Sequence, residues 1–190
     1  MIEVHDNIFS PKLINLIESS VFSNSFINGK DLSPKWNFIP NLVSNNSNDK
    51  EHGFGFGSDF ITLNGPTVPH FSFYSQLLYE FCHFKNFFLY SILGGRFFLQ
   101  SPLIDPTPSI PHYDFYENDG TPTDGIWILL YYVNDSDGDT IFYEQDGVTE
   151  LKRVNPKKGR CVFSKNTMLH SAGKPTKSPR AIINFNFKII

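Results

Sequence analysis

Residues 180–190, RAIINFNFKII, decide the fold of this chain, because polar and apolar side chains alternate along them. On an extended strand, successive side chains point to opposite faces. One face then carries Arg180, Ile182, Asn184, Asn186 and Lys188, and the other carries Ala181, Ile183, Phe185, Phe187 and Ile189. A half-solvated strand would turn the polar face to water. A barrel with a polar site inside would turn it inward and pack the apolar face against covering helices.

Short apolar runs bounded by Gly, Pro, Asn and Asp recur ahead of this segment, at 87–93, 96–99, 126–133, 140–143 and 161–163. This punctuation is typical of an all-β sandwich or barrel. Ser10 and Pro11 resemble a helix cap with proline in the first turn, so a helix should begin near residue 11. Apolar residues at helical spacing predict a second helix over about 70–84. The expected fold is mainly β with supporting helices: a double-stranded β-helix, or jelly roll, of the cupin-like kind.

The length of 190 residues fits one domain. We expect residues 1–190 to form it, with 1–90 supplying helical support and flap loops and 91–190 the jelly-roll core. Residues 22–57 are rich in Asn, Ser, Gly and Pro, which predicts loops or a flap that could act as a lid.

Composition excludes several functions. The formal charge of -3 offers no cationic field for phosphates, which argues against a nucleic acid partner. Cys82 and Cys161 lie among apolar neighbours and are interpreted as buried hydrophobes rather than a disulfide or a catalytic pair. No signal peptide and no apolar run of about 18 residues are present, so the expected location is cytoplasmic, without membrane contact.

The stretch IPHYDFY, residues 110–116, contains a candidate metal-binding motif. His112 and Asp114 are two residues apart and share a face of an extended segment. His170, 58 residues downstream, is the best placed third ligand. Two histidines and one carboxylate occupy one face of an octahedral ion and leave the other positions open, which suits iron(II) and oxygen chemistry. A lone His-x-Asp is more often a hydrogen-bonded surface pair, so the motif alone is weak.

Arg180 strengthens the interpretation, since an inward guanidinium would bind a carboxylate with two parallel N–H groups. Because His112, Asp114, His170 and Arg180 occur in this order, the chain resembles the 2-oxoglutarate and iron(II)-dependent oxygenases, most closely the prolyl-4-hydroxylase-like branch. The resemblance rests on the segments PHYDFY, WILLYYVND, DSDGDTIFYE, VNPKKGRCVFSKNTMLHSAGKP and SPRAIINFNF, which lie within residues 96–190.

The resemblance implies a role for each matching position. His112, Asp114 and His170 would be the catalytic iron ligands, and Arg180 would bind the far carboxylate of 2-oxoglutarate. Tyr131 and Thr140 fall where relatives contact the co-substrate, although DGDT departs from the usual Gly-Gly-Glu-Thr. The cofactor-binding set that the resemblance implies is Arg180, Tyr131, Thr140 and Asn186, and Gln100 is a further candidate site residue.

The implied activity is hydroxylation by iron(II), 2-oxoglutarate and O2, with ascorbate in support. The expected substrate is a protein or peptide, at proline. Two alternatives stay open: a hydroxylase of a small molecule or modified nucleobase, and a catalytically silent jelly roll that binds a ligand. The sequence does not indicate the oligomeric state.

Overall fold

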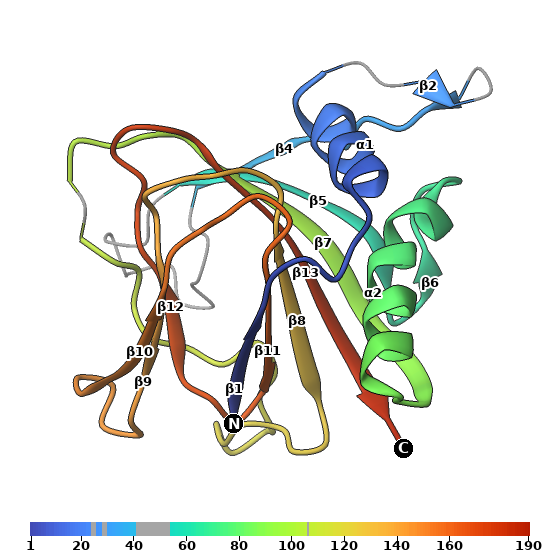
Figure 1. Ribbon diagram of the computed structural model, residues 1–190. Helices are drawn as coiled ribbons and strands as arrows, with labels where there is room; N and C mark the ends of the chain where they lie inside the picture. The colour runs from blue at the N-terminus through green and yellow to red at the C-terminus, as the bar shows by residue number, and fades with distance from the viewer. Residues whose placement is uncertain (24–25, 28–29, 41–53, 106) are drawn as a thin grey trace.

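The computed structural model describes residues 1–23, 26–27, 30–40, 54–105 and 107–190, which are organised around a large antiparallel sheet (Figure 1). Its strands lie in the order β1, β11, β8, β13, β7, β5, β4, and β6 pairs with β5. The bounds of these strands are β1 (Ile2–His5), β4 (Asn37–Ile39), β5 (Gly55–Thr62), β6 (Gly65–Pro66), β7 (Leu89–Gln100), β8 (Trp127–Tyr132), β11 (Cys161–Lys165) and β13 (Arg180–Ile189).

A smaller sheet lies opposite the large one, in the order β10 (Glu150–Val154), β9 (Thr140–Tyr143) and β12 (His170–Ala172). Apolar side chains from both sheets meet between them, among them Leu130, Phe142 and Ile182. A separate ribbon joins β2 (Phe26–Ile27) to β3 (Lys30–Asp31). The mainly β architecture predicted from the sequence is confirmed, and the two facing sheets form its jelly roll.

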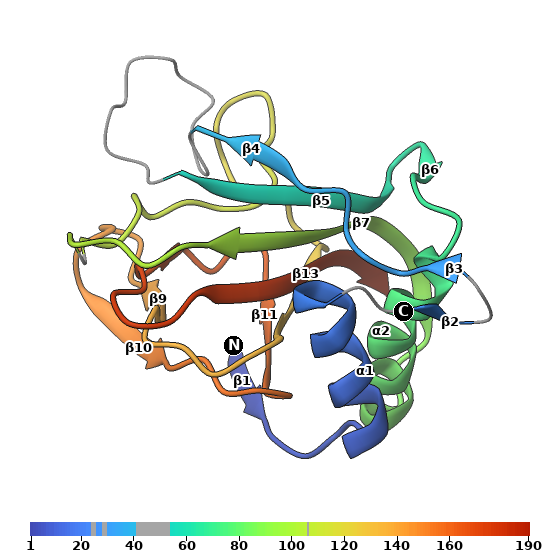
Figure 2. The same cartoon turned by 90° about the horizontal axis from the view of Figure 1, so that it is seen from above.

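Two helices cover the outer face of the large sheet, away from the small sheet (Figures 1 and 2). Helix α1 (Pro11–Phe22) begins where the sequence predicted, with the Ser10 hydroxyl accepting a hydrogen bond from the Leu13 N–H at 3.2 Å. Helix α2 (Phe71–Lys85) matches the second predicted helix. Both bury apolar residues in the main core, which also takes in Cys82 and Cys161 as free, buried thiols.

Strand β13 lies inside the large sheet, paired with β8 and β7. Ile183 faces the helices beside Tyr131 and Phe97, whereas Asn184 faces the small sheet between Leu130 and Arg96. Residues 180–187 are all buried. The polar face of this strand therefore points inward, as a barrel with a polar interior requires.

Several strands were not predicted. Most of the run 87–93 and the run 96–99 belong to one strand, β7 (Leu89–Gln100), which continues through Gly94 and Gly95. Glycine is needed at 95 because a Cβ there would lie 2.5 Å from the Phe60 ring. Residues 1–90 supply more than helices and loops, since β1, β4 and β5 join the large sheet.

The expected flap over 22–57 lies partly outside the described residues, which omit 24–25, 28–29 and 41–53. Its described part contains β2, β3, β4 and the start of β5. Of the helices in the described ranges, none combines the length and apolar character that a membrane crossing demands.

Candidate metal centre

The structure places His112 and His170 side by side through their backbones. His112 N–H donates to the His170 carbonyl at 2.9 Å, and His170 N–H donates to the His112 carbonyl at 3.1 Å. His170 opens β12, which is held in turn by β9. The two imidazole ring centres are 4.6 Å apart. A backbone bridge thus joins segments that are far apart in the sequence.

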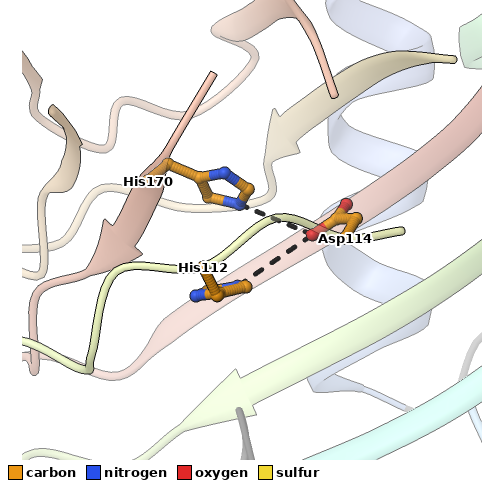
Figure 3. Close-up of side chains that lie close together, drawn as sticks. All are labelled: His112, Asp114 and His170. Atoms are coloured by element: carbon orange, nitrogen blue, oxygen red, sulfur yellow. Dashed lines mark ion pairs between the residues drawn. The ribbon is translucent and has the colours of Figure 1, made fainter. Parts of the chain in front are cut away.

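Asp114 completes the cluster (Figure 3). Its Oδ1 lies 3.5 Å from His170 Nε2 and 4.0 Å from His112 Nε2. One donor atom from each of the three residues lies within 4.8 Å of the others. The side chains that the sequence singled out therefore converge on a common point.

The far nitrogen of each ring fixes its orientation. His112 Nδ1 lies 3.1 Å from the Ile110 carbonyl oxygen, and His170 Nδ1 lies 3.1 Å from the Met168 carbonyl oxygen. In the tautomer with the proton on Nδ1, each ring donates to that carbonyl and turns the lone pair of Nε2 towards Asp114. Metal-bound histidines are commonly oriented in this way. The donor set therefore fits a divalent ion with nitrogen and oxygen ligands.

The cluster is electrostatically coupled. Burial raises the pKa of the Asp114 carboxyl, but the hydrogen bond and charge of His170, aided by His112 and Asn184, outweigh it and hold the pKa well below its usual range. Burial lowers the pKa of His170, but Asp114 outweighs that effect and leaves it raised. The carboxylate is thus ionised and ready to act as a ligand.

Asn166 holds the Asp114 segment, and sequence reasoning missed it. Its Oδ1 accepts the backbone N–H groups of Asp114 and Phe115 at 3.1 and 3.0 Å. Its Nδ2 donates to the carbonyls of Phe115 and Thr123 at 2.8 and 3.0 Å. Asn166 is 0% exposed, so this amide fixes an irregular segment from inside the protein. The only signal in the sequence was its position four residues before His170.

Arg180 is a buried cation at the other end of the site, 2% exposed. It donates from Nε to the Gly138 carbonyl at 2.7 Å, from Nη1 to Gln100 Oε1 at 3.1 Å and from Nη2 to Thr140 Oγ1 at 2.9 Å. All three acceptors are uncharged. Among the described residues, no carboxylate lies within ion-pair distance of Arg180. A guanidinium has five N–H donors, so two stay available for an acid.

Gly138 is required at its place, because a Cβ there would lie 2.9 Å from Arg180 Cδ and 2.7 Å from the Gly173 carbonyl oxygen. This close approach explains the glycine of the DGDT turn. Thr140, predicted near the co-substrate, contacts Arg180 directly, and so does Gln100.

The expectation for Tyr131 is wrong. Tyr131 is packed in the main core on the helix side, its ring 5.4 Å from that of Phe9. Tyr132 faces the site instead. Its hydroxyl donates to Thr140 Oγ1 at 2.7 Å, and Arg180 Cζ lies 5.8 Å from its ring centre. In WILLYYVND both strand faces are apolar, so alternation could not tell which tyrosine points inward.

One cavity of about 590 Å³ joins these parts. His112, Asp114 and His170 lie on its wall together with Arg180, and Asn184 and Asn186 line it as well. Volumes of roughly 300–1,000 Å³ are usual for small-molecule sites. The cavity therefore has room for a small dicarboxylic acid beside a substrate group.

Comparisons with known proteins agree with this arrangement. Residues 108–188 match the family model of the 2OG-Fe(II) oxygenase superfamily, which confirms the superfamily that the motifs indicated. No curated protein matches the chain.

Solved structures share the fold. A viral collagen prolyl hydroxylase from Paramecium Bursaria Chlorella virus-1, in complex with 2OG, is 15% identical with a TM-score of 0.59; the match covers 100% of this chain and 96% of that one. A Pseudomonas putida prolyl-4-hydroxylase is 14% identical with a TM-score of 0.57, covering 98% and 91%. HygX from Streptomyces hygroscopicus, with nickel, 2-oxoglutarate and hygromycin B bound, is 11% identical with a TM-score of 0.61, covering 98% and 82%.

Proposed function

We propose that this chain, which over residues 108–188 belongs to the 2-oxoglutarate/iron(II) oxygenase superfamily, hydroxylates a protein or peptide substrate at proline. The superfamily uses iron(II), 2-oxoglutarate and O2. We assign His112, Asp114 and His170 as the metal ligands and Arg180 as the residue that binds the distal carboxylate of 2-oxoglutarate.

One observation carries the proposal: a single cavity has a three-donor metal cluster on one part of its wall and a buried, unbalanced guanidinium on another. A buried cation without a counter-ion is costly. A carboxylate ligand would remove that cost by accepting the two remaining N–H groups of Arg180. The cluster and Arg180 thus match the two ends of a 2-oxo dicarboxylic acid.

The protein residues bind and orient the reactants. When bound, iron(II) supplies the oxidative chemistry in which O2 and 2-oxoglutarate give succinate and CO2 while a substrate C–H becomes C–OH. His112, Asp114 and His170 would hold the ion. Gln100 and Thr140 hold the guanidinium of Arg180 in place, which orients the keto acid. Apolar side chains such as Leu130 and Ile182 line the same cavity.

Aromatic side chains at the cavity favour a prolyl substrate. Tyr113, Phe115 and Tyr116 line it, and Tyr116 is 44% exposed. The Tyr113 and Tyr116 rings pack edge to face with their centres 5.6 Å apart. Such rings offer apolar faces on which a pyrrolidine ring can pack. The viral collagen prolyl hydroxylase and the Pseudomonas putida prolyl-4-hydroxylase share this fold.

A second candidate function is hydroxylation of a polar small molecule. The amide oxygens of Asn184 and Asn186 are buried in the cavity wall without a hydrogen-bond partner among the described residues. Hydroxyl or amine groups of a polar metabolite could donate to them, whereas a prolyl ring has no N–H. The HygX structure, which shares the fold, contains hygromycin B.

The two candidates are separated by one assay. The protein is reconstituted with iron(II), 2-oxoglutarate and ascorbate, and succinate is measured alone, with a Pro-Pro-Gly repeat peptide, and with hygromycin B. If the peptide stimulates succinate formation and its mass increases by that of one oxygen atom, the first function is supported. Stimulation by hygromycin B alone supports the second. His112→Ala is the control, and succinate formation that survives it contradicts the ligand assignment.

A further inference from the structure

Asn184 contacts the candidate ligand Asp114 directly. Its Nδ2 donates to Asp114 Oδ2 at 2.8 Å. The other oxygen, Oδ1, is the one that faces His170 Nε2 and His112 Nε2. The two oxygens of the carboxylate therefore have separate surroundings: one is bound by an amide, and the other points to where the imidazoles converge.

The two residues differ in how firmly their backbones are held. Asp114 lies in an irregular segment outside the named strands, so pairing with a neighbouring strand does not fix its side chain. Asn184 lies in the middle of β13, paired on one side with Leu130 of β8 and on the other with Arg96 of β7. It is 7% exposed. The hydrogen bond therefore anchors a loop carboxylate to a buried part of a strand that is paired on both sides.

The orientation of the Asn184 amide is itself determined. Turning it over would bring Oδ1 against Asp114 Oδ2, where two acceptors repel each other. The observed orientation leaves Asn184 Oδ1 buried without a hydrogen-bond partner among the described residues. An unsatisfied buried acceptor costs about 1–3 kcal/mol. That cost is understandable if the bond to Asp114 has a function.

We propose that Asn184 is a positioning residue of the metal centre, which holds Asp114 so that it offers Oδ1 alone to the ion. This inference rests on the proposed metal ligands. A carboxylate freed from Asn184 could turn and bind through both oxygens, which would take up a coordination position that the keto acid needs. Loss of partners that orient metal ligands commonly weakens metal binding by about 10- to 100-fold.

The test uses Co(II) alone as the probe, with the full chain and without 2-oxoglutarate. Asn184→Leu removes the donor at nearly constant volume. Its Co(II) affinity should fall about 10- to 100-fold, and its visible absorption spectrum should change because the coordination of the carboxylate changes. Lys188→Leu is the control: Lys188 is on the same strand, but it is exposed and lies outside the cavity lining. Its Co(II) affinity and spectrum should equal those of the wild type.

The outcomes separate this inference from the proposed function. A wild-type protein that binds no Co(II) overturns the metal site itself. If the wild-type protein binds Co(II) and Asn184→Leu has the same Co(II) affinity and the same spectrum, only the positioning role is overturned. If Asn184→Leu does not fold by circular dichroism, Asn184→Ser replaces it. Its hydroxyl is too short to reach Oδ2, so an unchanged spectrum in that variant overturns the role equally.

Discussion

Replacing Arg180 by methionine should separate binding of the keto acid from binding of the metal. The guanidinium is buried, and its three hydrogen bonds go to uncharged acceptors, which leaves two N–H groups for a ligand carboxylate. Each charge-assisted hydrogen bond contributes about 1.5–3 kcal/mol. The loss of both, about 3–6 kcal/mol, corresponds to a fall in 2-oxoglutarate affinity of roughly 10²- to 10⁴-fold. Arg180→Lys should recover part of the lost affinity, because lysine keeps the positive charge but lacks the planar guanidinium with its parallel N–H donors.

The assay is a calorimetric titration of 2-oxoglutarate into the Co(II)-loaded protein. Arg96→Met is the control, because Arg96 also lines the cavity but is half exposed and already paired with Asp59 at 3.0 Å. It should change the affinity little. Equal affinity of Arg180→Met and wild type, with Co(II) binding intact, would refute the role of Arg180.

Three further predictions concern stability and reactivity. Tyr132→Phe removes a buried hydrogen bond and should lower the free energy of unfolding in urea by about 1–3 kcal/mol. Tyr131→Phe removes a hydroxyl that has no partner in the described part of the chain and should leave stability unchanged; equal losses would contradict the assigned faces. Asn166→Ala leaves several backbone groups unpaired, so it should lower the free energy of unfolding by about 3 kcal/mol and also weaken Co(II) binding. A variant as stable as the wild type would show that Asn166 does not hold the Asp114 segment. Burial raises the pKa of Cys82 to about 11 and of Cys161 to about 12, so both thiols stay protonated at neutral pH and should resist iodoacetamide until urea unfolds the chain; rapid labelling of the native protein would contradict their burial.

The strands that local pattern predicted are those buried on one or both faces. The alternation in β13 and the apolar runs of β8 and β11 follow directly from what each face contacts. Strands β1 and β10 carry charged residues and are partly exposed, so their local sequence resembles loops. They are strands because a neighbour offers its free edge, which is a tertiary effect.

Strand β5 illustrates a second limit. Its glycines read as loop signals, yet Gly57 is inside a sheet strand. A Cβ at this position would lie 2.4 Å from the Ile39 side chain. Glycine here serves close packing between strands rather than a turn, and only the neighbouring strand reveals that.

Some residues of the candidate site could likewise be predicted from the sequence, whereas others could not. The proposed metal ligands and Arg180 could be singled out from residue type and order, since the proposed chemistry demands those side chains. Asn166 and Tyr132 could not, because their roles depend on a backbone segment from elsewhere and on which strand face points inward. Sequence reasoning thus finds groups that react, whereas the groups that hold them need the geometry.

The most direct test of the account is a crystal structure of the protein with Mn(II) and 2-oxoglutarate, in which the anomalous signal locates the ion. We expect one ion bonded to His112 Nε2, Asp114 Oδ1 and His170 Nε2 at about 2.0–2.2 Å, with the distal carboxylate of the keto acid on Arg180. An ion held by other residues, or no ion in that cavity at saturating Mn(II), would contradict it.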